Sequence, residues 1–392
     1  MSPSRTVLIA GAGIGGLAAA IALADAGYRV IVFERDETPD TSGAGIQLSP
    51  NATRALASLG ALDLLASRAA EPERLLVANA LSGATLAVMT LGKVMREKFG
   101  APYLVCLRAD LHEVLHRIAS TRPEIELRFG SAVTDFSASG SGARANLLTG
   151  GKTEDIEGDA LIGADGIRSV VRAQLDRGSA ARHGGMSAWR ATIPADALPA
   201  NVEQPESVRV WLGPGAHLVH YPVGNGGEIN LVAVTTDSEP TASWGEARSG
   251  TELFPYFQDW HAAPRAVLAA ADAFRRWSIF EAPLMPRWAE GPVALLGDAA
   301  HGMFPFVAQG AATALEDAVA LGSAMRNAGD VPEALQAYER LRKPRATQIQ
   351  SAARNIGRIY HMPRPFGFGR DLVMKQIGGE GLMRQNAWIY RG

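Results

Sequence analysis

Residues 291–318 combine a carboxylate, a loop of small residues and the start of a helix. Val293–Leu296 is a short apolar run that suits a buried strand, and Gly297 and Asp298 follow directly at its end. A helical pattern begins near Gln309. A helix N-terminus favours anionic groups, because its N–H donors are free and its dipole is positive there. The spacing therefore predicts that Asp298 and this helix N-terminus lie beside the same ligand.

A second chemical motif opens the chain. Gly11-Ala-Gly13-Ile-Gly15-Gly16 fits the pattern G-x-G-x-x-G, between an apolar run and a helical run. The glycines permit a tight turn, let the backbone approach a pyrophosphate and let the helix pack on the strand. Glu34 ends the next apolar run, about 20 residues on, where a carboxylate accepts hydrogen bonds from ribose hydroxyls. The motif predicts a dinucleotide site without choosing between NAD and FAD.

Composition and charge exclude several other classes of protein. Val7–Ala24 is apolar enough for a signal peptide or a membrane span, but its glycines divide it into strand, turn and helix. The net charge of −2 gives no footprint for nucleic acid. The single cysteine, Cys106, allows no intramolecular disulfide and is expected to be buried and inert. We expect a cytoplasmic protein with no membrane, nucleic-acid or metal partner.

A third motif carries a family resemblance. Residues 159–163 read as a strand that ends in Gly163-Ala-Asp165-Gly166, before a helix start. In this order and at these separations, the three motifs resemble those of the single-component flavoprotein aromatic hydroxylases, the class A flavoprotein monooxygenases. In that family the reduced nicotinamide cofactor has no Rossmann domain of its own, which agrees with the single fingerprint here.

The resemblance implies FAD as the cofactor and NADH or NADPH as the co-substrate. It places the adenosine end of FAD at Glu34 and Arg35, the pyrophosphate near Asp165 and the ribityl chain at Asp298. The run 43–51 looks like the loop along which the flavin ring swings. The full set of cofactor-binding residues that it implies is Gly11, Gly13, Gly15, Gly16, Glu34, Arg35, Gly45, Arg108, Asp165, Asp298, Gln309, Gly310 and Ala311.

The elements that must position these residues change character along the chain. Strand and helix patterns alternate first, and short β-like runs between turn residues replace them at about 181–280. We therefore predict an α/β protein with an α+β insert, in which a Rossmann-like FAD-binding domain carries an inserted antiparallel β-sheet substrate domain and C-terminal helices. The expected FAD-binding domain comprises 1–74, 100–180 and 281–330, the substrate lobe 75–99 and 181–280, and the C-terminal helical segment 331–392.

Individual elements follow from periodicity. The predicted strands of the insert are 187–193, 208–212, 217–223 and 229–235, with a hairpin of 75–80 and 84–89; the predicted helices are 109–119, 311–328 and 332–360. Pro344 is expected to kink the last helix. The segment 362–392 looks irregular, and its aromatics, among them Trp388 and Tyr390, could dock on the body or on a second subunit.

The strand His217-Leu-Val-His-Tyr221-Pro is the main candidate for substrate chemistry. Alternation places His217 and Tyr221 on one face and His220 on the other. A hydroxylase needs a group that accepts the phenol proton, and histidine suits this role. The spacing is similar to that of the substrate strand in 3-hydroxybenzoate 6-hydroxylase and 6-hydroxynicotinate 3-monooxygenase. We predict His217 as the base and Tyr221 as a substrate hydrogen-bond partner; alternatively, His217 only satisfies polar groups of the strand.

Other candidate residues could either contact the substrate or have a purely structural role. Gln47 lies in the run 43–51 where hydroxynicotinate enzymes carry a histidine, which argues against that substrate. Phe304 and Pro305 could line an aromatic pocket or pack in the core. Arg190 could bind a substrate carboxylate, although an ion pair on the surface or between the lobes is the expectation. His301 is expected to be structural.

Together these features predict an NAD(P)H-dependent flavoprotein monooxygenase. The resemblance implies that it hydroxylates a small phenolic or hydroxypyridine carboxylic acid with dioxygen, through a flavin hydroperoxide. The alternatives are a non-aromatic hydroxylase or epoxidase, a halogenase, and a non-enzymatic flavin-binding redox regulator. Ser187 stands where halogenases carry the first tryptophan of Trp-x-Trp-x-Ile-Pro, and this difference argues against a halogenase. The sequence leaves monomer and homodimer both open.

Overall fold

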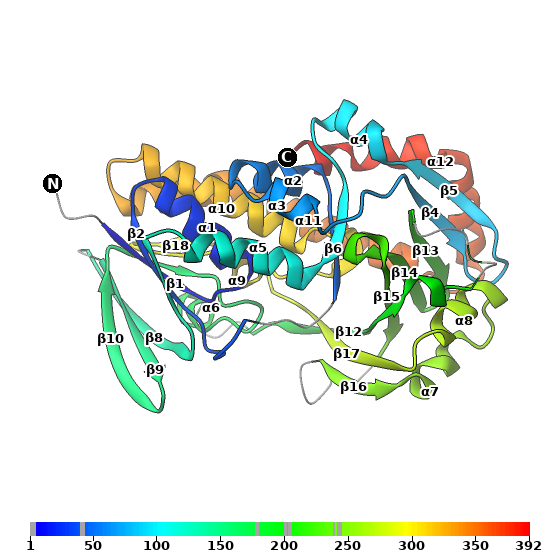
Figure 1. The fold of residues 1–392 in the computed structure, drawn as a ribbon, viewed down its shortest axis with the longest axis horizontal. Helices are drawn as coiled ribbons and strands as arrows, with labels where there is room; N and C mark the ends of the chain where they lie inside the picture. Colours follow the sequence, from blue (N-terminus) through cyan, green and yellow to red (C-terminus); the bar gives the residue numbers. More distant parts are fainter. Residues whose placement is uncertain are drawn as a thin grey trace.

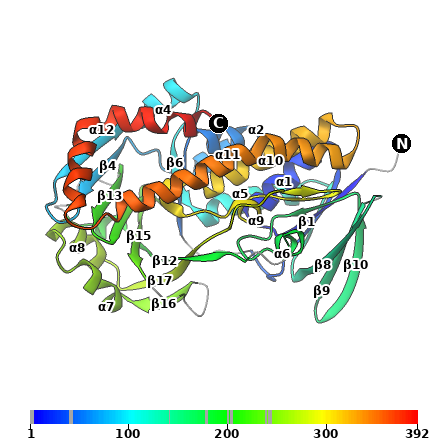
Figure 2. The same cartoon turned by 180° about the vertical axis from the view of Figure 1, so that it is seen from behind.

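The computed structural model shows an elongated molecule with two lobes (Figure 1). One lobe is built on a parallel sheet and the other on a large, mainly antiparallel sheet. The long helix α11 (Val331–Tyr360) runs along both lobes (Figure 2). The structure describes all residues except 1–4, 40–43, 141, 177–179, 200–201, 203–205, 238–239 and 241–244.

The first lobe is organised by a six-stranded sheet. Its order is β18 (Ala289–Glu290), β19 (Val293–Leu295), β11 (Ala160–Gly163), β1 (Thr6–Ala10), β2 (Arg29–Phe33) and β7 (Ile125–Arg128), and only the β18–β19 pair is antiparallel. After their first residues, Thr6 and Arg29, the inner strands β1 and β2 are apolar and buried, as strands covered on both faces must be. Because parallel strands end at the same edge, the loops after β1, β11 and β19 meet there, and each carries one of the three motifs.

Helices cover one face of this sheet and a small sheet lies against the other side. The helices are α1 (Ile14–Asp25), α5 (Arg108–Ser120) and α10 (Gly310–Asn327); the small antiparallel sheet consists of β8 (Ser131–Ser139), β9 (Gly142–Thr149) and β10 (Lys152–Gly158). Helix α1 is buried along most of its length, between the strands and α10. A Cβ at Gly322 would lie 2.7 Å from the Ala22 carbonyl oxygen, so a glycine lets α10 approach α1 closely.

The second lobe is an eight-stranded sheet. Its order is β16 (Glu246–Ser249), β17 (Ala273–Glu281), β12 (Arg182–Pro194), β15 (Glu228–Thr236), β14 (Ala216–Val223), β13 (Ser207–Gly213), β4 (Arg74–Asn79) and β5 (Thr85–Thr90). The four predicted strands and the joining hairpin are confirmed. The β13–β4 pair is parallel, however, so the expectation of a wholly antiparallel sheet is wrong at that pair. Parallel pairing is possible there because the two strands come from distant segments of the chain.

The two faces of the large sheet have different neighbours. The outer face packs on α7 (Gly250–Leu253), η3 (Phe254–Phe257) and α8 (Ala262–Ala269). The inner face is covered by the C-terminal helix and by the short ribbon of β3 (Gly45–Leu48) and β6 (Leu104–Leu107), which belongs to the first lobe in sequence. The remaining elements are α2 (Pro50–Ser58), α3 (Leu62–Ala66), α4 (Gly92–Phe99), α6 (Val170–Leu175), η1 (Ala195–Ala197), η2 (Gly224–Gly226), α9 (Asp298–His301) and η4 (Pro305–Val307).

The C-terminal segment differs from its prediction. Residues expected to be irregular form α12 (Phe366–Arg391), which is interrupted only at Gly378, where φ is 61°. Helix α11 continues through Pro344, and the kink expected there stays a prediction. The end of α12 docks on the body of the protein, where the Tyr390 and Phe99 rings meet edge to face at 5.3 Å. The glycines of this segment weaken its helical sequence pattern, and tertiary packing stabilises the helix.

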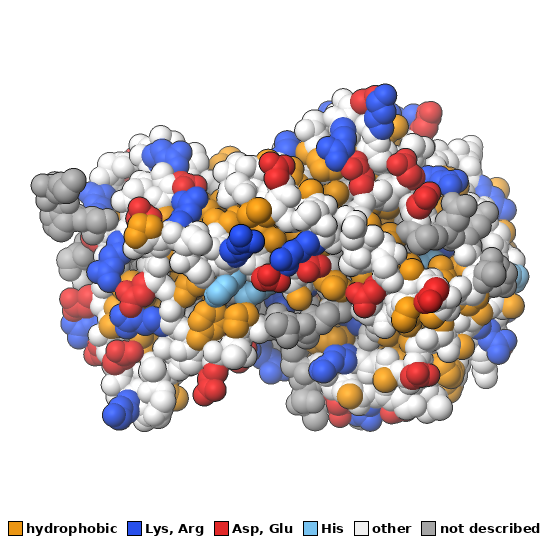
Figure 3. All heavy atoms as spheres, viewed as in Figure 1, with side chains coloured by type: hydrophobic (Ala, Val, Ile, Leu, Met, Phe, Trp, Pro, Cys, Tyr) orange, Lys and Arg blue, Asp and Glu red, His pale blue; other side chains and the backbone are white. Residues whose placement is uncertain are grey.

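The surface charges and the helix lengths bear on the nucleic-acid-binding and membrane-protein classes that the sequence analysis excluded. Charged side chains of both signs are intermingled on the face seen in Figure 3. Among the described residues, no helix is both long and apolar enough to cross a membrane. The two large sheets lie in separate lobes, and the division into an FAD-binding domain and a substrate lobe with the boundaries given above stays a prediction.

Candidate functional site

The fingerprint turn after β1 is shaped by its glycines. Gly11 has φ of 100°, and its N–H donates to the Phe33 carbonyl at 2.7 Å. A Cβ at Gly16 would lie 1.9 Å from the Gly11 carbonyl oxygen, so no other residue fits this contact. A Cβ at Gly13 would meet nothing within 4 Å. The protein therefore leaves open space at the backbone position where the motif brings a pyrophosphate close.

Glu34 stands at the end of β2 beside this turn. The Ala12 N–H donates to its Oε2 at 2.8 Å and the Asp36 N–H to its Oε1 at 3.1 Å. A carboxylate held in this position can accept hydrogen bonds from ribose hydroxyls, which is the role predicted for Glu34. Arg35, in contrast, has a side chain that is 73% exposed and lies 3.8 Å from Asp36 on the surface. The structure therefore brings Glu34, and not the Arg35 guanidinium, to the turn.

Asp298 and the N-terminus of α10 lie together, as their spacing predicted. The Asp298 Oδ1 is 3.9 Å from the position of a Cβ on Gly310. The Asp298 side chain is exposed to solvent although protein atoms surround it closely, and we call the open space beside it the crevice. Burial raises the pKa of Asp298, and His301 and Arg108 partly oppose this. The carboxylate and the positive end of an 18-residue helix thus border one crevice.

Gln309 is tied to the start of α2. Its Nε2 donates to the Ser49 hydroxyl at 2.7 Å, and Asn51 donates to its Oε1 at 2.9 Å. Only the backbone of Gln309, Gly310 and Ala311 is therefore available to a flavin ring. The run 43–51 is mostly regular structure, because residues 45–48 form β3 and Pro50 begins α2. The expectation of a loop is wrong there, and Gly43 lies outside the described residues.

Asp165 follows β11 at the same edge of the sheet. Its Oδ2 accepts the Val170 N–H at 2.7 Å, at the start of α6. Its Oδ1 is buried and has no hydrogen-bond partner among the described residues. The position of a Cβ on Gly11 is 3.0 Å from the Asp165 Cα, so the two motifs touch. The free oxygen is an acceptor beside the fingerprint turn.

Gly45 and Arg108 connect the first lobe to the large sheet. The Gly45 N–H donates to Asn230 Oδ1 at 2.7 Å, and a Cβ on Gly45 would lie 2.5 Å from the Asn230 side chain. The Arg108 N–H donates to the Ala44 carbonyl at 2.7 Å where α5 begins. Glycine at position 45 therefore lets β3 lie directly against β15.

His217 and Tyr221 share the inner face of β14, as alternation predicted. Their side chains are 4% and 3% exposed. His220 points to the opposite face, where it accepts a hydrogen bond from Trp211 Nε1 at 3.1 Å. Burial, with Arg209 nearby, lowers the pKa of His220 to about 3. Burial likewise lowers the pKa of His217 well below its ordinary value, and His361 adds to this.

Aromatic rings from η4 face the His217 end of the strand. The Phe306 ring lies 5.4 Å from the His217 ring and 5.8 Å from the Phe304 ring. Phe304 and Phe306 also pack with Ala188 and Val234 on the same inner face. The segment Phe304–Phe306 therefore forms a wall opposite the strand that carries His217, although Pro305 itself is exposed.

A polar cluster occupies the Tyr221 end of the same face. The Gln47 side chain from β3 accepts a hydrogen bond from the Tyr103 hydroxyl at 2.6 Å and also hydrogen-bonds Tyr221. Tyr103 was missed by sequence reasoning. Burial raises the pKa of Tyr103 and of Tyr221, so both phenols stay neutral donors. Gln47 and Tyr221, predicted separately from distant motifs, are thus in contact.

Arg190 stands between these two ends. Direct pairing across β12, β15 and β14 puts Arg190, Val232 and Val219 in one row, next to the row of His217. Its guanidinium carbon lies 5.4 Å from the centre of the Trp277 ring, and its buried Nε has no hydrogen-bond partner. Among the described residues no carboxylate pairs with Arg190, so the expected ion pair is not seen.

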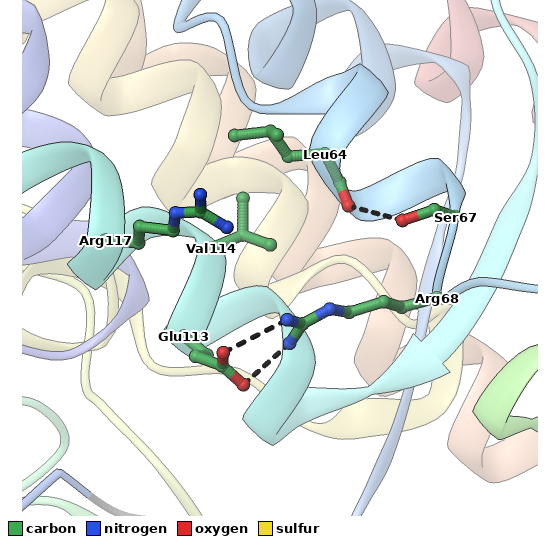
Figure 4. A pocket seen from close by; sticks show the side chains of 6 residues that line it. All are labelled: Leu64, Ser67, Arg68, Glu113, Val114 and Arg117. Carbon is green, nitrogen blue, oxygen red and sulfur yellow. Dashed lines mark hydrogen bonds and ion pairs between the residues drawn. The ribbon is translucent and has the colours of Figure 1, made fainter.

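His361 is a second site residue that sequence reasoning missed. It directly follows α11, and its Nε2 is 2.7 Å from His217 Nδ1. It was hidden because 144 residues separate the two histidines and because the segment beyond it carries no clear pattern. The shallow surface pocket between α3 and α5, by comparison, is closed by the Arg68–Glu113 ion pair and contains no group of the site (Figure 4).

These residues fit FAD. The crevice offers an open backbone cradle at Gly13, a ribose acceptor at Glu34, an unpartnered oxygen on Asp165 and a carboxylate with a helix N-terminus at Asp298 and Gly310. This combination, next to a buried sheet face, defines a flavoprotein with a covering substrate lobe. The model of the FAD binding domain family matches residues 4–353, and the chain belongs to this family.

Relatives and solved structures narrow the class. The chain is 36% identical over 393 residues to 3-hydroxybenzoate 6-hydroxylase of Klebsiella oxytoca, covering 100% of this chain and 97% of the relative. It is 36% identical over 386 residues to 3-amino-4-hydroxybenzoate 2-monooxygenase of Streptomyces cremeus, covering 98% and 94%. The structure of Klebsiella pneumoniae HpxO complexed with FAD and uric acid matches with a TM-score of 0.87 at 26% identity, covering 98% and 96%.

The predicted class is confirmed. The protein is an FAD-dependent monooxygenase of the aromatic-hydroxylase type, with NADH or NADPH as co-substrate. It is an enzyme and not a flavin-binding regulator. FAD, when bound, supplies the redox and oxygen chemistry, and the chain supplies binding, orientation and exclusion of water.

Proposed function

We propose that this enzyme hydroxylates a small phenolic or hydroxypyridine carboxylic acid, bound between the inner face of β14 and the Phe304–Phe306 wall. The observation that carries the proposal is that His217 and Tyr221 share one buried face, with the Phe306 ring of the segment between Asp298 and α10 lying 5.4 Å from the His217 ring. The two side chains start about 13 Å apart along the strand, enough for one substituted ring between them. The names of the relatives, which are hydroxybenzoate enzymes, support the same class of substrate.

His217 is the proposed base. Because its Nδ1 is engaged by His361, its Nε2 is the nitrogen left for the substrate hydroxyl. Burial keeps the imidazole neutral at neutral pH, which is the form that accepts a proton. Tyr221 and Gln47 are proposed to orient the ring by hydrogen bonds at the other end of the strand. Phe304 and Pro305 are proposed as the apolar wall.

Arg190 is proposed to bind the carboxylate of the substrate. A guanidinium that is half-buried, stacked on Trp277 and without a carboxylate partner among the described residues has capacity for an anionic ligand. A planar guanidinium binds a carboxylate through two parallel hydrogen bonds. This assignment replaces the earlier expectation of an ion pair at Arg190.

The cofactor contacts are proposed from the same geometry. Gly11, Gly13, Gly15 and Gly16 would accept the pyrophosphate, with Glu34 on the ribose and Asp165 nearby. Asp298 would bind the ribityl chain, while Gly45 and Arg108 approach from the β3 side. Arg35 remains a weaker candidate because its side chain lies on the surface. With one buried cysteine and no intramolecular disulfide, we propose a cytoplasmic location; monomer and homodimer are both compatible with the proposal.

The decisive experiment measures NADH and NADPH oxidation by the FAD-loaded enzyme with a panel of hydroxybenzoates, hydroxypyridine acids and aminobenzoates. The proposal expects one acid to stimulate oxidation and to yield a hydroxylated product by mass spectrometry. In His217→Ala we expect kcat for that acid to fall at least a hundredfold with FAD content unchanged. The proposal would be contradicted if no aromatic acid stimulated NADH or NADPH oxidation, or if His217→Ala kept the pH profile of wild type.

A further inference from the structure

We propose that His361 is a positioning and proton-transfer residue, which fixes the tautomer of His217 and carries the substrate proton from it to solvent. The inference rests on the proposed function of His217. It assigns a role to the segment between α11 and α12, which no sequence motif places near the site.

The two imidazoles are joined directly. His217 Nδ1 and His361 Nε2 are 2.7 Å apart, within the range of a good hydrogen bond, and the ring centres are 5.0 Å apart. No described group binds the remaining Nε2 of His217. A single proton can lie between the two rings, and when it sits on His217 Nδ1, the Nε2 lone pair is free to accept a proton. With the proton on that nitrogen, His217 has the tautomer that a base requires.

The pair is held in place by the surrounding fold. The His361 carbonyl accepts the Gly215 N–H at 3.4 Å, just before β14, and its N–H donates to the Gly357 carbonyl at 3.2 Å. The Phe306 ring packs on both histidines, at 5.4 and 5.8 Å from their centres. A Cβ on Gly357 would lie 2.4 Å from the Phe306 ring, so glycine is needed for this enclosure.

The surroundings of the pair make a second acceptor necessary. Burial disfavours the charged form of His217 strongly, so a proton taken from a phenol is not stable there. His361 is less deeply placed, being half-buried where His217 is 4% exposed. Burial, with Arg370 of α12 nearby, lowers the pKa of His361 to about 4, so the proton does not remain on His361 either.

The charged and titratable groups around His361 come from three elements. They are His217 on β14, Tyr360 on α11, and Arg370 with its ion-pair partner Asp371 on α12. Burial raises the pKa of Tyr360 to about 12, so Tyr360 stays neutral. Arg370 donates to the Tyr360 carbonyl at 2.9 Å and is the cation that discourages charge on His361.

The proposed transfer balances as follows. The substrate O–H bond breaks and an N–H bond forms at His217 Nε2. The Nδ1–H bond of His217 breaks and an N–H bond forms at His361 Nε2, and His361 releases its Nδ1 proton to water. Both histidines end neutral with their protons exchanged, the substrate is left as a phenolate, and no electrons move.

The test compares His361→Gln and His361→Ala with wild type in the FAD-loaded enzyme, using the acid that the panel experiment identifies as the best substrate. Glutamine keeps a hydrogen-bonding group but cannot transfer a proton. We expect kcat to fall at least about tenfold in both variants. Glutamine should leave KM and FAD content near wild type, and alanine should raise KM as well. Added imidazole should restore part of the rate in His361→Ala, and the acidic and basic limbs of the pH profile should shift in both.

Controls separate this proposal from failure of the proposed function. His116→Gln, which changes a half-buried histidine on α5, should leave kcat and the pH profile unchanged. If His217→Ala abolishes turnover while His361→Gln keeps the kcat and pH profile of wild type, the relay is wrong and the base stands. If His361→Ala is unfolded by circular dichroism, the decision rests on His361→Gln alone. If no aromatic acid is hydroxylated, the proposed function itself has failed.

Discussion

At the scale of single residues, the proposed substrate site consists of a few polar groups set into an apolar sheet face. His217, Tyr221 and Arg190 are separated by valines on neighbouring strands. Buried polar groups of this kind discriminate strongly, because a ligand that cannot pair with them leaves them unsatisfied. Specificity should therefore depend on the substituents of the ring more than on its size.

Arg190 gives the first test of this view. In Arg190→Gln the bidentate contact with a carboxylate is lost, and we expect KM for the acid to rise about 10- to 100-fold, equivalent to about 1.5–3 kcal/mol. FAD content and kcat should change far less. Steady-state kinetics with the acid and with its carboxamide check this, since the carboxamide should bind both proteins equally. Equal KM values for the acid in both proteins would remove Arg190 from the site.

At the scale of elements, the strand, turn and helix of the fingerprint give a matched pair of variants. A Cβ at Gly13 meets open space and its φ is an ordinary −71°, so Gly13→Ala should fold normally yet block the approach of the pyrophosphate. A Cβ at Gly16 collides with the Gly11 carbonyl, so Gly16→Ala should lose stability as well as FAD. Thermal unfolding and FAD titration of both apoproteins measure the difference. Normal FAD affinity in Gly13→Ala would place the cofactor elsewhere.

Strand β14 makes a prediction about pH. His220 is neutral in the folded protein down to about pH 3, whereas the unfolded chain binds its proton below about 6.5. Stability is therefore lost as pH falls below 6.5, by about 1.4 kcal/mol per pH unit for this one group. In His220→Gln, which still offers an acceptor to Trp211, the fall in unfolding free energy between pH 7 and 4.5 should be about 3 kcal/mol smaller. Urea unfolding at both pH values measures it, and identical slopes would refute it.

Elements and motifs with local signals could be predicted from the sequence, and contacts between distant segments could not. The β1 turn, Asp298 with α10, and the face of His217 and Tyr221 follow from periodicity and glycine spacing. Tyr103 and His361 are set by tertiary packing, which brings β6 and the end of α11 onto β14. The helix α12 was missed because its glycines weaken the helical pattern, while its stability comes from docking.

At the scale of the whole molecule, a buried charge network joins the elements around Asp298 and the start of α10. Asp317 on α10 binds His301 at 2.5 Å and Arg342 of α11 at 2.8 Å. Glu316 binds Arg342, Arg345 and Asn51, and Asn51 in turn holds Gln309. Burial alone would raise the pKa of Asp317. The combined attraction of His301 and Arg342 is larger than this effect, so the pKa of Asp317 is lowered. His301 is structural, as expected, and the network links α2, α10 and α11.

Removing the central cation of this network should be costly. In Arg342→Ala the buried carboxylates of Glu316 and Asp317 lose one partner each and keep Arg345 and His301, so we expect the unfolding free energy at pH 7 to fall by about 3 kcal/mol. FAD affinity should fall too, because the network holds Gln309 at the start of α10. The Arg342–Asp317 ion pair stabilises the protein only while Asp317 is ionised. The difference in unfolding free energy between Arg342→Ala and wild type should therefore shrink as pH drops below about 4. Arg340→Ala, two residues away on the exposed face of α11, should change stability by less than about 0.5 kcal/mol. Urea unfolding of the three proteins at pH 7 and pH 3 decides the matter, and equal stability of both variants would show that the network does not stabilise the fold.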